Sequence, residues 1–164
     1  MTVLTRYQVR MAWPDQDEDL IARLKIICWR EAYPGILPQP ILDDLNLGRS
    51  IVEWTHALQT GIAWIAEQSG GLVGFGHARD NEVTTLYVRK MDQGRGVGRE
   101  LLQHCFDEIA CLGHDEAHLW VLEKNIKAQR FYERMGGVAT ARRPVGFSRY
   151  PWIAEVRYDF RLPS

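Results

Sequence analysis

The spacing of hydrophobic positions is helical in the first third of the chain. The stretch RYQVRMAW, residues 6–13, predicts a first strand. Pro14 and a run of acidic residues then suit the N-terminal end of a helix, because negative charge is favourable there. Apolar residues recur at helical spacing until Tyr33–Gly35, where YPG ends the helix. Two further helical regions are predicted, from Pro38 to about Leu47 and from Ile51 to Gln59.

From Gly61 the pattern becomes that of strands. IAWIAEQ and GLVGFGHA flank a Ser-Gly-Gly turn and predict a hairpin, and EVTTLYV, residues 82–88, predicts the next strand. A helix with one broad apolar face is predicted from Gly98 to about Leu112, followed by the strand AHLWVL. Asn125 can cap a further helix that ends at Gly136–Gly137.

The last strand is predicted over PWIAEVRYDF, residues 151–160. Alternation puts Trp152, Ala154, Val156, Tyr158 and Phe160 on one face and Ile153, Glu155, Arg157 and Asp159 on the other. We therefore expect this strand to be covered on one side only. The element order, βααα-βββ-α-β-α-ββ, predicts an α/β (α+β) protein with a mixed sheet and helices packed on it.

Composition narrows the class of protein. With 164 residues, 46% of them hydrophobic, the chain is predicted to form one domain over residues 1–164. The net charge of −1 provides no field to recruit nucleic acid or an anionic membrane. The N-terminal residues do not have the pattern of a signal peptide or a membrane span, and three cysteines without a CxxC motif suit a reducing compartment. We expect a cytoplasmic protein with no nucleic-acid or membrane partner.

The stretch QGRGVGRE, residues 93–100, lies between a predicted strand and a predicted helix. Glycines let backbone N–H groups approach a ligand, and the start of a helix is an electropositive end that binds anions. Arg95 and Arg99 add positive charge. A tight turn without a ligand explains the glycines as well, but the spacing fits neither a Rossmann fingerprint nor a Walker loop. If the loop binds a ligand, a diphosphate is the group that suits it.

A second set of polar side chains follows the next strand. Asn125 and Tyr132 are seven residues apart, which is close to two helical turns, so both side chains project in the same direction. An amide and a phenol then line one wall of a groove that ends at the glycine loop. Asn125 has a second interpretation as a simple helix cap, and Tyr132 as a tyrosine at an interface.

Together, LYVRKMDQGRGVGRELL and VLEKNIKAQRFYERMGG resemble the acetyl-CoA-binding core of the GCN5-related N-acetyltransferase (GNAT) superfamily. Gln93, Gly96 and Gly98 meet its Q-x-x-G-x-G pattern, and a second pattern is met by Asn125, Ala128, Phe131, Tyr132, Glu133 and Gly136. The resemblance covers roughly residues 82–137. It implies a mostly antiparallel sheet of six to seven strands, splayed between the fourth and fifth strands.

The resemblance also implies roles for individual residues. The coenzyme A pyrophosphate is held by the loop that follows Gln93, formed by Gly94, Arg95, Gly96, Val97, Gly98 and Arg99. The pantetheine arm pairs with the strand backbone at Leu86, Tyr87 and Val88 and bonds the Asn125 amide. Tyr132 protonates the leaving thiolate. Lys124, Lys127 and Arg130 can meet the 3′-phosphate or form a solvated helix face. Gly137 departs from the family, which often has an aromatic residue there.

Acetyl transfer to an amine also needs a proton acceptor, because alkylamines are largely protonated at neutral pH. Glu82, eleven residues before Gln93, is the candidate base, with a solvated strand-end charge or a water chain as the alternatives. His114 and His118 are four apart, but the second lies in a predicted strand, so no metal site is expected.

These observations predict an acetyl-CoA-dependent N-acetyltransferase that moves an acetyl group directly to a primary amine, on a small molecule or a peptide, without a metal. The alternative is a coenzyme A-binding sensor or interaction module without turnover. The acceptor is not specified; Glu31 or Tyr33, in the variable N-terminal third, can contact an amine. A homodimer through the one-sided final strand is possible.

Overall fold

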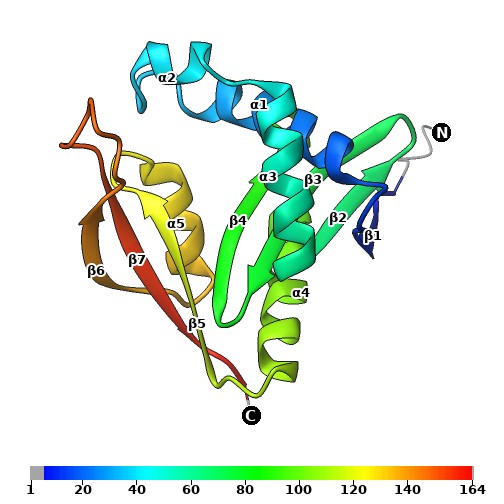
Figure 1. Ribbon diagram of the computed structural model, residues 1–164. Helices are drawn as coiled ribbons and strands as arrows, with labels where there is room; N and C mark the ends of the chain where they lie inside the picture. The colour runs from blue at the N-terminus through cyan, green and yellow to red at the C-terminus, as the bar shows by residue number, and fades with distance from the viewer. Residues whose placement is uncertain (1–5, 164) are drawn as a thin grey trace.

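The computed structural model describes residues 6–163; the ends of the predicted domain, residues 1–5 and 164, lie outside the described residues. The chain forms one seven-stranded sheet in the order β1-β2-β3-β4-β5-β7-β6, with helices packed on it (Figure 1). The predicted fold class, a mixed and mostly antiparallel sheet flanked by helices, is confirmed.

The elements follow the predicted order, with one addition, a single 3-10 turn before the fourth helix. The strands are β1 Gln8–Met11, β2 Ile62–Gln68, β3 Gly71–Arg79, β4 Glu82–Val88, β5 Glu116–Leu122, β6 Val138–Pro144 and β7 Ala154–Arg161. The helices are α1 Glu18–Ala32, α2 Gln39–Asp43, α3 Leu47–Thr60, α4 Val97–Cys111 and α5 Ile126–Arg134, and the turn η1 is Lys90–Asp92. In the part of the chain that the structure describes, no helix has the length and apolarity needed to cross a membrane.

The sheet separates in its middle. Strands β1 to β4 pair antiparallel, and so do β5, β7 and β6, but β4 and β5 run parallel and share one registered pair, Glu82 with His118. The His118 N–H also donates to the Asn81 carbonyl over 3.0 Å. Beyond this point the two strands diverge, as the ribbon shows (Figure 1). The predicted splay between the fourth and fifth strands is therefore present, and it opens toward the glycine loop.

The glycines of β3 explain how closely α4 approaches the sheet. A Cβ at Gly74 would lie 3.0 Å from Leu101 Cδ1, and one at Gly76 would lie 3.1 Å from the Cys105 sulfur. The residue between them, Phe75, faces the opposite way and meets Trp54 of α3 edge-on, with ring centroids 5.2 Å apart. Alternation along β3 thus places α4 on one face of the sheet and α3 on the other.

Several predicted boundaries move, and two of them show what decides where an element begins. Helix α3 begins at Leu47 and not at Ile51, because the Asn46 side chain caps it by accepting a hydrogen bond from the Arg49 N–H over 2.9 Å. The final strand begins at Ala154, so the predicted alternation fails before it. There the Trp152 side chain is exposed and Ile153 is buried. Strand β7 pairs on both edges, which leaves β6 as the free edge of this half of the sheet.

Candidate functional site

The glycine loop has a backbone shape that requires glycine at two positions. Gly94 has a φ of +76° and Gly96 a φ of +83°, both in the left-handed region that disfavours side chains. Gly96 is the N-cap of α4, which begins at Val97, one residue earlier than predicted. Gly98 lies inside the helix, where an added Cβ would make only ordinary contacts with Phe131 and Val88.

The first turn of α4 presents backbone donors to a cavity. Its first internal hydrogen bond runs from the Glu100 N–H to the Gly96 carbonyl over 3.1 Å. The N–H groups of Val97, Gly98 and Arg99 precede that bond, so they have no partner within the helix. All three residues line the main cavity. This end of the cavity therefore carries donors and the positive end of a helix, an arrangement that suits a phosphate group.

A buried carboxylate holds the loop in place. Asp92 is 5% exposed and accepts hydrogen bonds from Arg89 Nε over 2.9 Å and from Arg95 Nη1 over 3.0 Å. Arg95 Nη1 also donates to Gln68 Oε1 over 3.0 Å. The Arg95 side chain is thus directed to Asp92 and β2, and the residue is not among those lining the cavity. Of the two arginines predicted to face an anion, the structure places only Arg99 in the lining.

Gln93 connects the end of β4 to α5. Its amide nitrogen donates to the Val88 carbonyl over 3.1 Å, and its amide oxygen accepts from Lys127 Nζ over 2.6 Å. Elsewhere the edge of β4 that faces β5 has no registered strand partner beyond Glu82. Leu86 and Tyr87 therefore keep an edge that an extended ligand arm can pair with, while the Val88 carbonyl is already engaged by Gln93.

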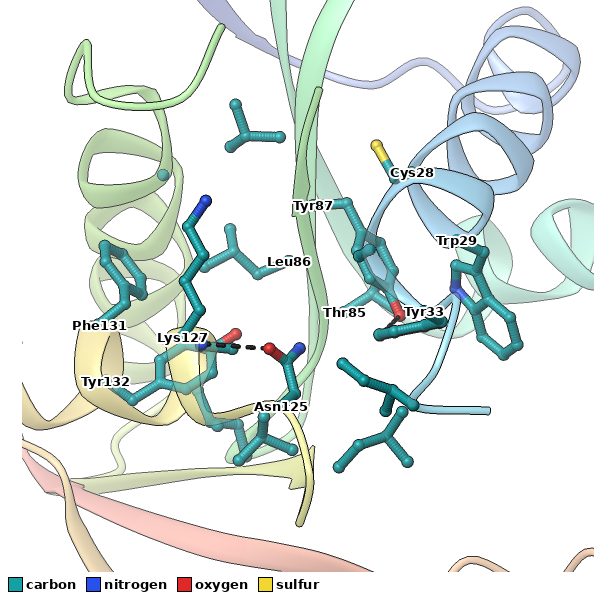
Figure 2. Close-up of a pocket in the computed structure, with 18 of the residues that line it drawn as sticks. Cys28, Trp29, Tyr33, Thr85, Leu86, Tyr87, Asn125, Lys127, Phe131 and Tyr132 are labelled. Carbon is teal, nitrogen blue, oxygen red and sulfur yellow. Dashed lines mark hydrogen bonds between the residues drawn. The ribbon is translucent and has the colours of Figure 1, made fainter. Parts of the chain in front are cut away.

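The main cavity fills the gap between β4 and β5 and has a volume of about 1060 Å³. Figure 2 shows α5 on one side, with Asn125, Lys127 and Tyr132, and the end of α1 on the other, with Cys28, Trp29 and Tyr33. Strand β4 runs between them. The cavity joins the glycine loop to the predicted amide and phenol. Of the predicted cofactor-binding residues, it is lined by Leu86, Tyr87, Val88, Gln93, Gly94, Gly96, Val97, Gly98, Arg99 and Asn125.

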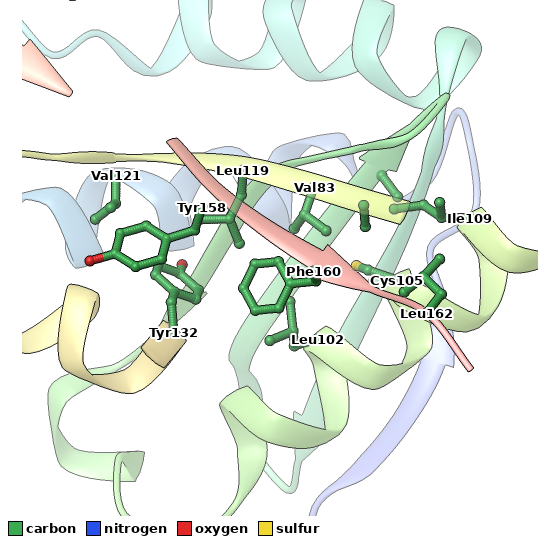
Figure 3. Close-up of a cluster of buried hydrophobic side chains, with 12 residues drawn as sticks. Val83, Leu102, Cys105, Ile109, Leu119, Val121, Tyr132, Tyr158, Phe160 and Leu162 are labelled. Carbon is green, nitrogen blue, oxygen red and sulfur yellow. The ribbon is translucent and has the colours of Figure 1, made fainter. Parts of the chain in front are cut away.

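Asn125 and Tyr132 both line the cavity, as their spacing predicts. The Asn125 side-chain oxygen caps α5 by accepting from the Ala128 N–H over 3.2 Å, which leaves the amide nitrogen for other partners. The Tyr132 ring packs beside Tyr158 and Phe160 in the cluster shown in Figure 3. Its hydroxyl makes no hydrogen bond with any residue that the structure describes. Burial raises the pKa of the Tyr132 phenol, so the group is neutral and keeps its proton.

Glu82 lies away from these residues. It stands at the closed end of the splay, where its carboxylate oxygen is 3.7 Å from His118 Nε2, and it is not among the residues lining the cavity. Thr84, two residues further along the same strand, does line the cavity. A proton that moves from an amine in the cavity to Glu82 must therefore travel beyond the cavity lining, and a water chain can carry it there.

The wall opposite Tyr132 contains an aromatic group that sequence reasoning only partly found. The Tyr33 and Tyr87 hydroxyls are 3.1 Å apart, and the Trp29 ring meets Tyr33 edge-on. Burial raises the pKa of both phenols. The Trp29 indole N–H is close enough to lower the pKa of Tyr87, yet it does not reach hydrogen-bond geometry with any described residue. Tyr87 was predicted to act through its backbone; its side-chain partner, 54 residues away, has no local signal in the sequence.

Of the other predicted residues, Glu31, Lys124 and Lys127 line the cavity and Arg130 does not. Two further basic residues, Lys90 and Arg134, line it without having been predicted. His114 is bonded to Asp80 and His118 lies beside Glu82, so these two histidines have separate partners. Within residues 6–163, no three His, Cys, Asp or Glu side chains gather as a metal site would require.

Comparison with known proteins agrees with this geometry. Residues 59–136 match the family described as "Acetyltransferase (GNAT) domain". The protein named Probable N-acetyltransferase Rv2775, from Mycobacterium tuberculosis, is 33% identical over 140 residues, which cover 77% of each chain. The chain therefore belongs to the GNAT superfamily, and it is an N-acetyltransferase of the acyltransferase class.

Solved structures show the same fold. A GCN5-related N-acetyltransferase from Rhodopseudomonas palustris superposes with a TM-score of 0.80 at 21% identity, over 99% of both chains. The protein yncA from Salmonella typhimurium, whose structure holds its cofactor acetyl-CoA, gives a TM-score of 0.73 at 19% identity, over 98% of this chain and 96% of that one. At these identities the likeness concerns the fold alone.

Proposed function

We propose that this protein uses acetyl-CoA to acetylate a primary amine, and that the acetyl group passes directly from the thioester to the amine while both are bound. One observation carries the proposal. A single cavity joins the free N–H groups at the start of α4 to the neutral phenol of Tyr132. A diphosphate and a thioester are the two ends of acetyl-CoA, and the residues at the two ends of the cavity fit them.

Each part of the coenzyme has a matching group of residues in the cavity. The N–H groups of Val97, Gly98 and Arg99 would hold the pyrophosphate, with Lys90 or Lys124 nearby for the remaining phosphate. The unpaired edge of β4 at Leu86 and Tyr87 would accept the pantetheine arm as an added strand, and the free amide nitrogen of Asn125 would donate to it. Arg95 supports the loop through Asp92 and does not touch the coenzyme in this proposal.

Direct transfer is favoured over an acyl-enzyme intermediate. The cavity does contain a nucleophilic residue type, Cys28. Burial, however, raises the pKa of the Cys28 thiol to about 12, so at neutral pH it is a thiol and not the reactive thiolate. The amine is thus the nucleophile in the proposal. Its nitrogen bonds to the acetyl carbon, the carbon–sulfur bond breaks, and Tyr132 gives its proton to the departing sulfur.

The amine must also lose a proton. Glu82 remains the proposed final acceptor, with water carrying the proton past Thr84 toward the closed end of the splay. Among the described residues, two carboxylates line the cavity: Glu155 accepts from Arg143 Nε over 2.7 Å, and Glu31 accepts one hydrogen bond from the Lys90 backbone N–H over 3.1 Å. Glu82 is proposed over these two from its position at the start of β4.

Thiol release in the presence of acetyl-CoA and a panel of primary amines tests the proposal, with acetyl-CoA binding measured separately by calorimetry. We expect binding together with amine-dependent release of free coenzyme A. Binding without release for every amine would indicate a sensor. Absence of binding would refute the coenzyme assignment.

Cys28, Cys105 and Cys111 are free thiols, which supports a reducing compartment and hence the cytoplasm. We propose a homodimer through β6 or an open face, because both edges of β7 are paired. Sedimentation at several protein concentrations tests this; a single monomeric species throughout would contradict it.

A further inference from the structure

We propose that the acceptor is a primary amine on an apolar or aromatic body that carries no carboxylate. This inference rests on the proposed function and names the substrate class of the same site. It concerns the half of the cavity between the end of α1 and the loop that joins β6 to β7.

The walls of this acceptor half are apolar. A cluster of buried side chains, Tyr33, Leu37, Leu42 and Ile153, forms its base. Half-buried apolar side chains that pack on this cluster also line the cavity: Trp29, Ile36, Leu122, Val145 and Phe147. Because these side chains contact the core on one side and the cavity on the other, they present apolar surface to whatever binds. Such surface favours an apolar ligand in proportion to the area buried.

The polar groups on the aromatic side chains of the acceptor half, two phenols and an indole, are neutral. The Tyr33 and Tyr87 hydroxyls share one hydrogen bond, which leaves one O–H and several lone pairs for a ligand. The indole N–H of Trp29 is buried and without a partner among the described residues. Hydroxyl and indole groups can hydrogen-bond a neutral amine or its acetyl carbonyl. They provide no charge that would balance a carboxylate.

The charged groups of the cavity disfavour polycations and amino acids. Glu155 is paired with Arg143, and Glu31 accepts one hydrogen bond from the Lys90 backbone N–H, so a polyamine with several charges finds one carboxylate in the lining without a cationic partner among the described residues. Lys127 is bonded to Gln93. Lys124 borders both the main cavity and a smaller one of about 220 Å³ beside Leu37 and Trp152. A carboxylate-bearing acceptor would need this lysine or Arg134, which also lines the cavity, so an amino acid is the competing hypothesis.

The size of the cavity favours a small acceptor. Ligand pockets commonly have volumes of about 300–1000 Å³. The cavity here measures about 1060 Å³ and must hold the pantetheine arm and acetyl group together with the acceptor. An amine with one ring or a short alkyl chain fits the remaining part.

The experiment compares kcat/KM for butylamine, pentylamine, hexylamine, phenethylamine, phenylalanine and spermidine, at saturating acetyl-CoA. We expect about a fourfold rise for each added methylene, from the burial of apolar surface. We also expect phenethylamine to exceed phenylalanine, which adds only a carboxylate, by at least about tenfold. A flat alkyl series, or higher values for phenylalanine or spermidine, would overturn the inference.

Phe147→Ala tests the acceptor wall. Phe147 lies in the loop between β6 and β7 and contributes to no strand or helix, so the variant should fold. We expect kcat/KM for phenethylamine to fall about tenfold with a smaller change for butylamine. The matched control is Ser148→Ala, an exposed neighbour outside the cavity lining, which should behave as wild type. An equal loss for both amines would count against the assignment.

Calorimetry with acetyl-CoA separates a failure of the acceptor class from a failure of the proposed function. If the protein binds acetyl-CoA and releases thiol but ranks the amines differently, only the acceptor class is wrong. If acetyl-CoA does not bind, or no amine triggers release, the proposed function fails and the acceptor class fails with it. Thermal melting of each variant shows whether it has folded.

Discussion

The hydroxyls of Tyr33 and Tyr87 lie 3.1 Å apart, although one residue follows α1 and the other lies in β4. Removing one hydroxyl breaks this bond without changing the β4 backbone. Tyr87→Phe should therefore raise the KM for the amine about fivefold, the value of one ordinary hydrogen bond, with the Kd for acetyl-CoA unchanged.

The control for this variant is Tyr158→Phe, because the Tyr158 hydroxyl bonds Glu133 and does not line the cavity. Steady-state kinetics and calorimetry on both variants check the prediction. Equal amine KM values in wild type and Tyr87→Phe would remove the hydroxyl pair from acceptor binding.

Tyr132→Phe should lower kcat by about 10²-fold while acetyl-CoA affinity changes little, because the hydroxyl acts as sulfur leaves. The ring itself stays in the apolar cluster, so the fold is preserved. Single-turnover thiol release and calorimetry provide the two numbers. An unaltered kcat would exclude Tyr132 from the proton transfer.

Gly96→Val should weaken coenzyme A binding by about tenfold or more, because a branched residue at a φ of +83° shifts the donors at the start of α4. Gly113→Val is the matched control. Gly113 also has a positive φ, +95°, but it follows the opposite end of α4 and does not line the cavity, so binding should stay near wild type. Wild-type affinity in a folded Gly96→Val protein would refute the loop as the pyrophosphate site.

Glu82→Gln should lower kcat/KM at pH 7 by at least about tenfold, and the deficit should shrink as pH rises, because more of the amine is then already neutral. Glu116→Gln, an exposed acid at the start of β5, is the control. A pH–rate profile of each variant gives the comparison. Profiles that coincide with wild type would leave Glu82 as a solvated strand-end charge.

Stability should fall between pH 7.5 and 5.5, partly through His77. Burial lowers the pKa of this histidine, whose ring bonds Thr84 and the Ala57 carbonyl. Below about pH 6.5 the unfolded chain binds the proton more readily than the folded one. The contribution of His77 is therefore complete above that pH and is lost as pH falls toward the folded pKa.

Urea unfolding of wild type and His77→Gln at both pH values measures this effect. The variant should show a shallower decline, since its side chain does not titrate. The pKa of His118 is also lowered by burial, so part of the decline should persist in the single variant. Identical declines in the two proteins would show that His77 contributes nothing.

The local sequence pattern was sufficient to predict the order of the elements and the wall of the cavity that carries Asn125 and Tyr132. The pattern predicted the order of the seven strands and five helices, with no range for β6, and the distance of two turns between Asn125 and Tyr132 brought both to one wall. It failed where a boundary depends on a cap, as at Asn46, or where a strand begins later than its pattern, as at Trp152.

Contacts between side chains on distant segments could not be predicted from the sequence, because they depend on how the segments pack. Arg95 was expected to face an anion, but its guanidinium is bonded to the buried Asp92 carboxylate over 3.0 Å. Glu82 was predicted to be the base from its place eleven residues before Gln93, and the register of β4 with β5 places it at the closed end of the splay, outside the cavity lining. Both outcomes depend on how distant segments pack, which residue types and spacing do not encode locally.

The separation of β4 from β5 has a consequence for the molecule as a whole. Two partial sheets meet at one registered residue pair, Glu82 and His118, and the facing strand edges above it have no registered partner strand. An occupant of this gap would supply the missing middle strand. Substrate recognition and completion of the protein's own architecture would then be the same event.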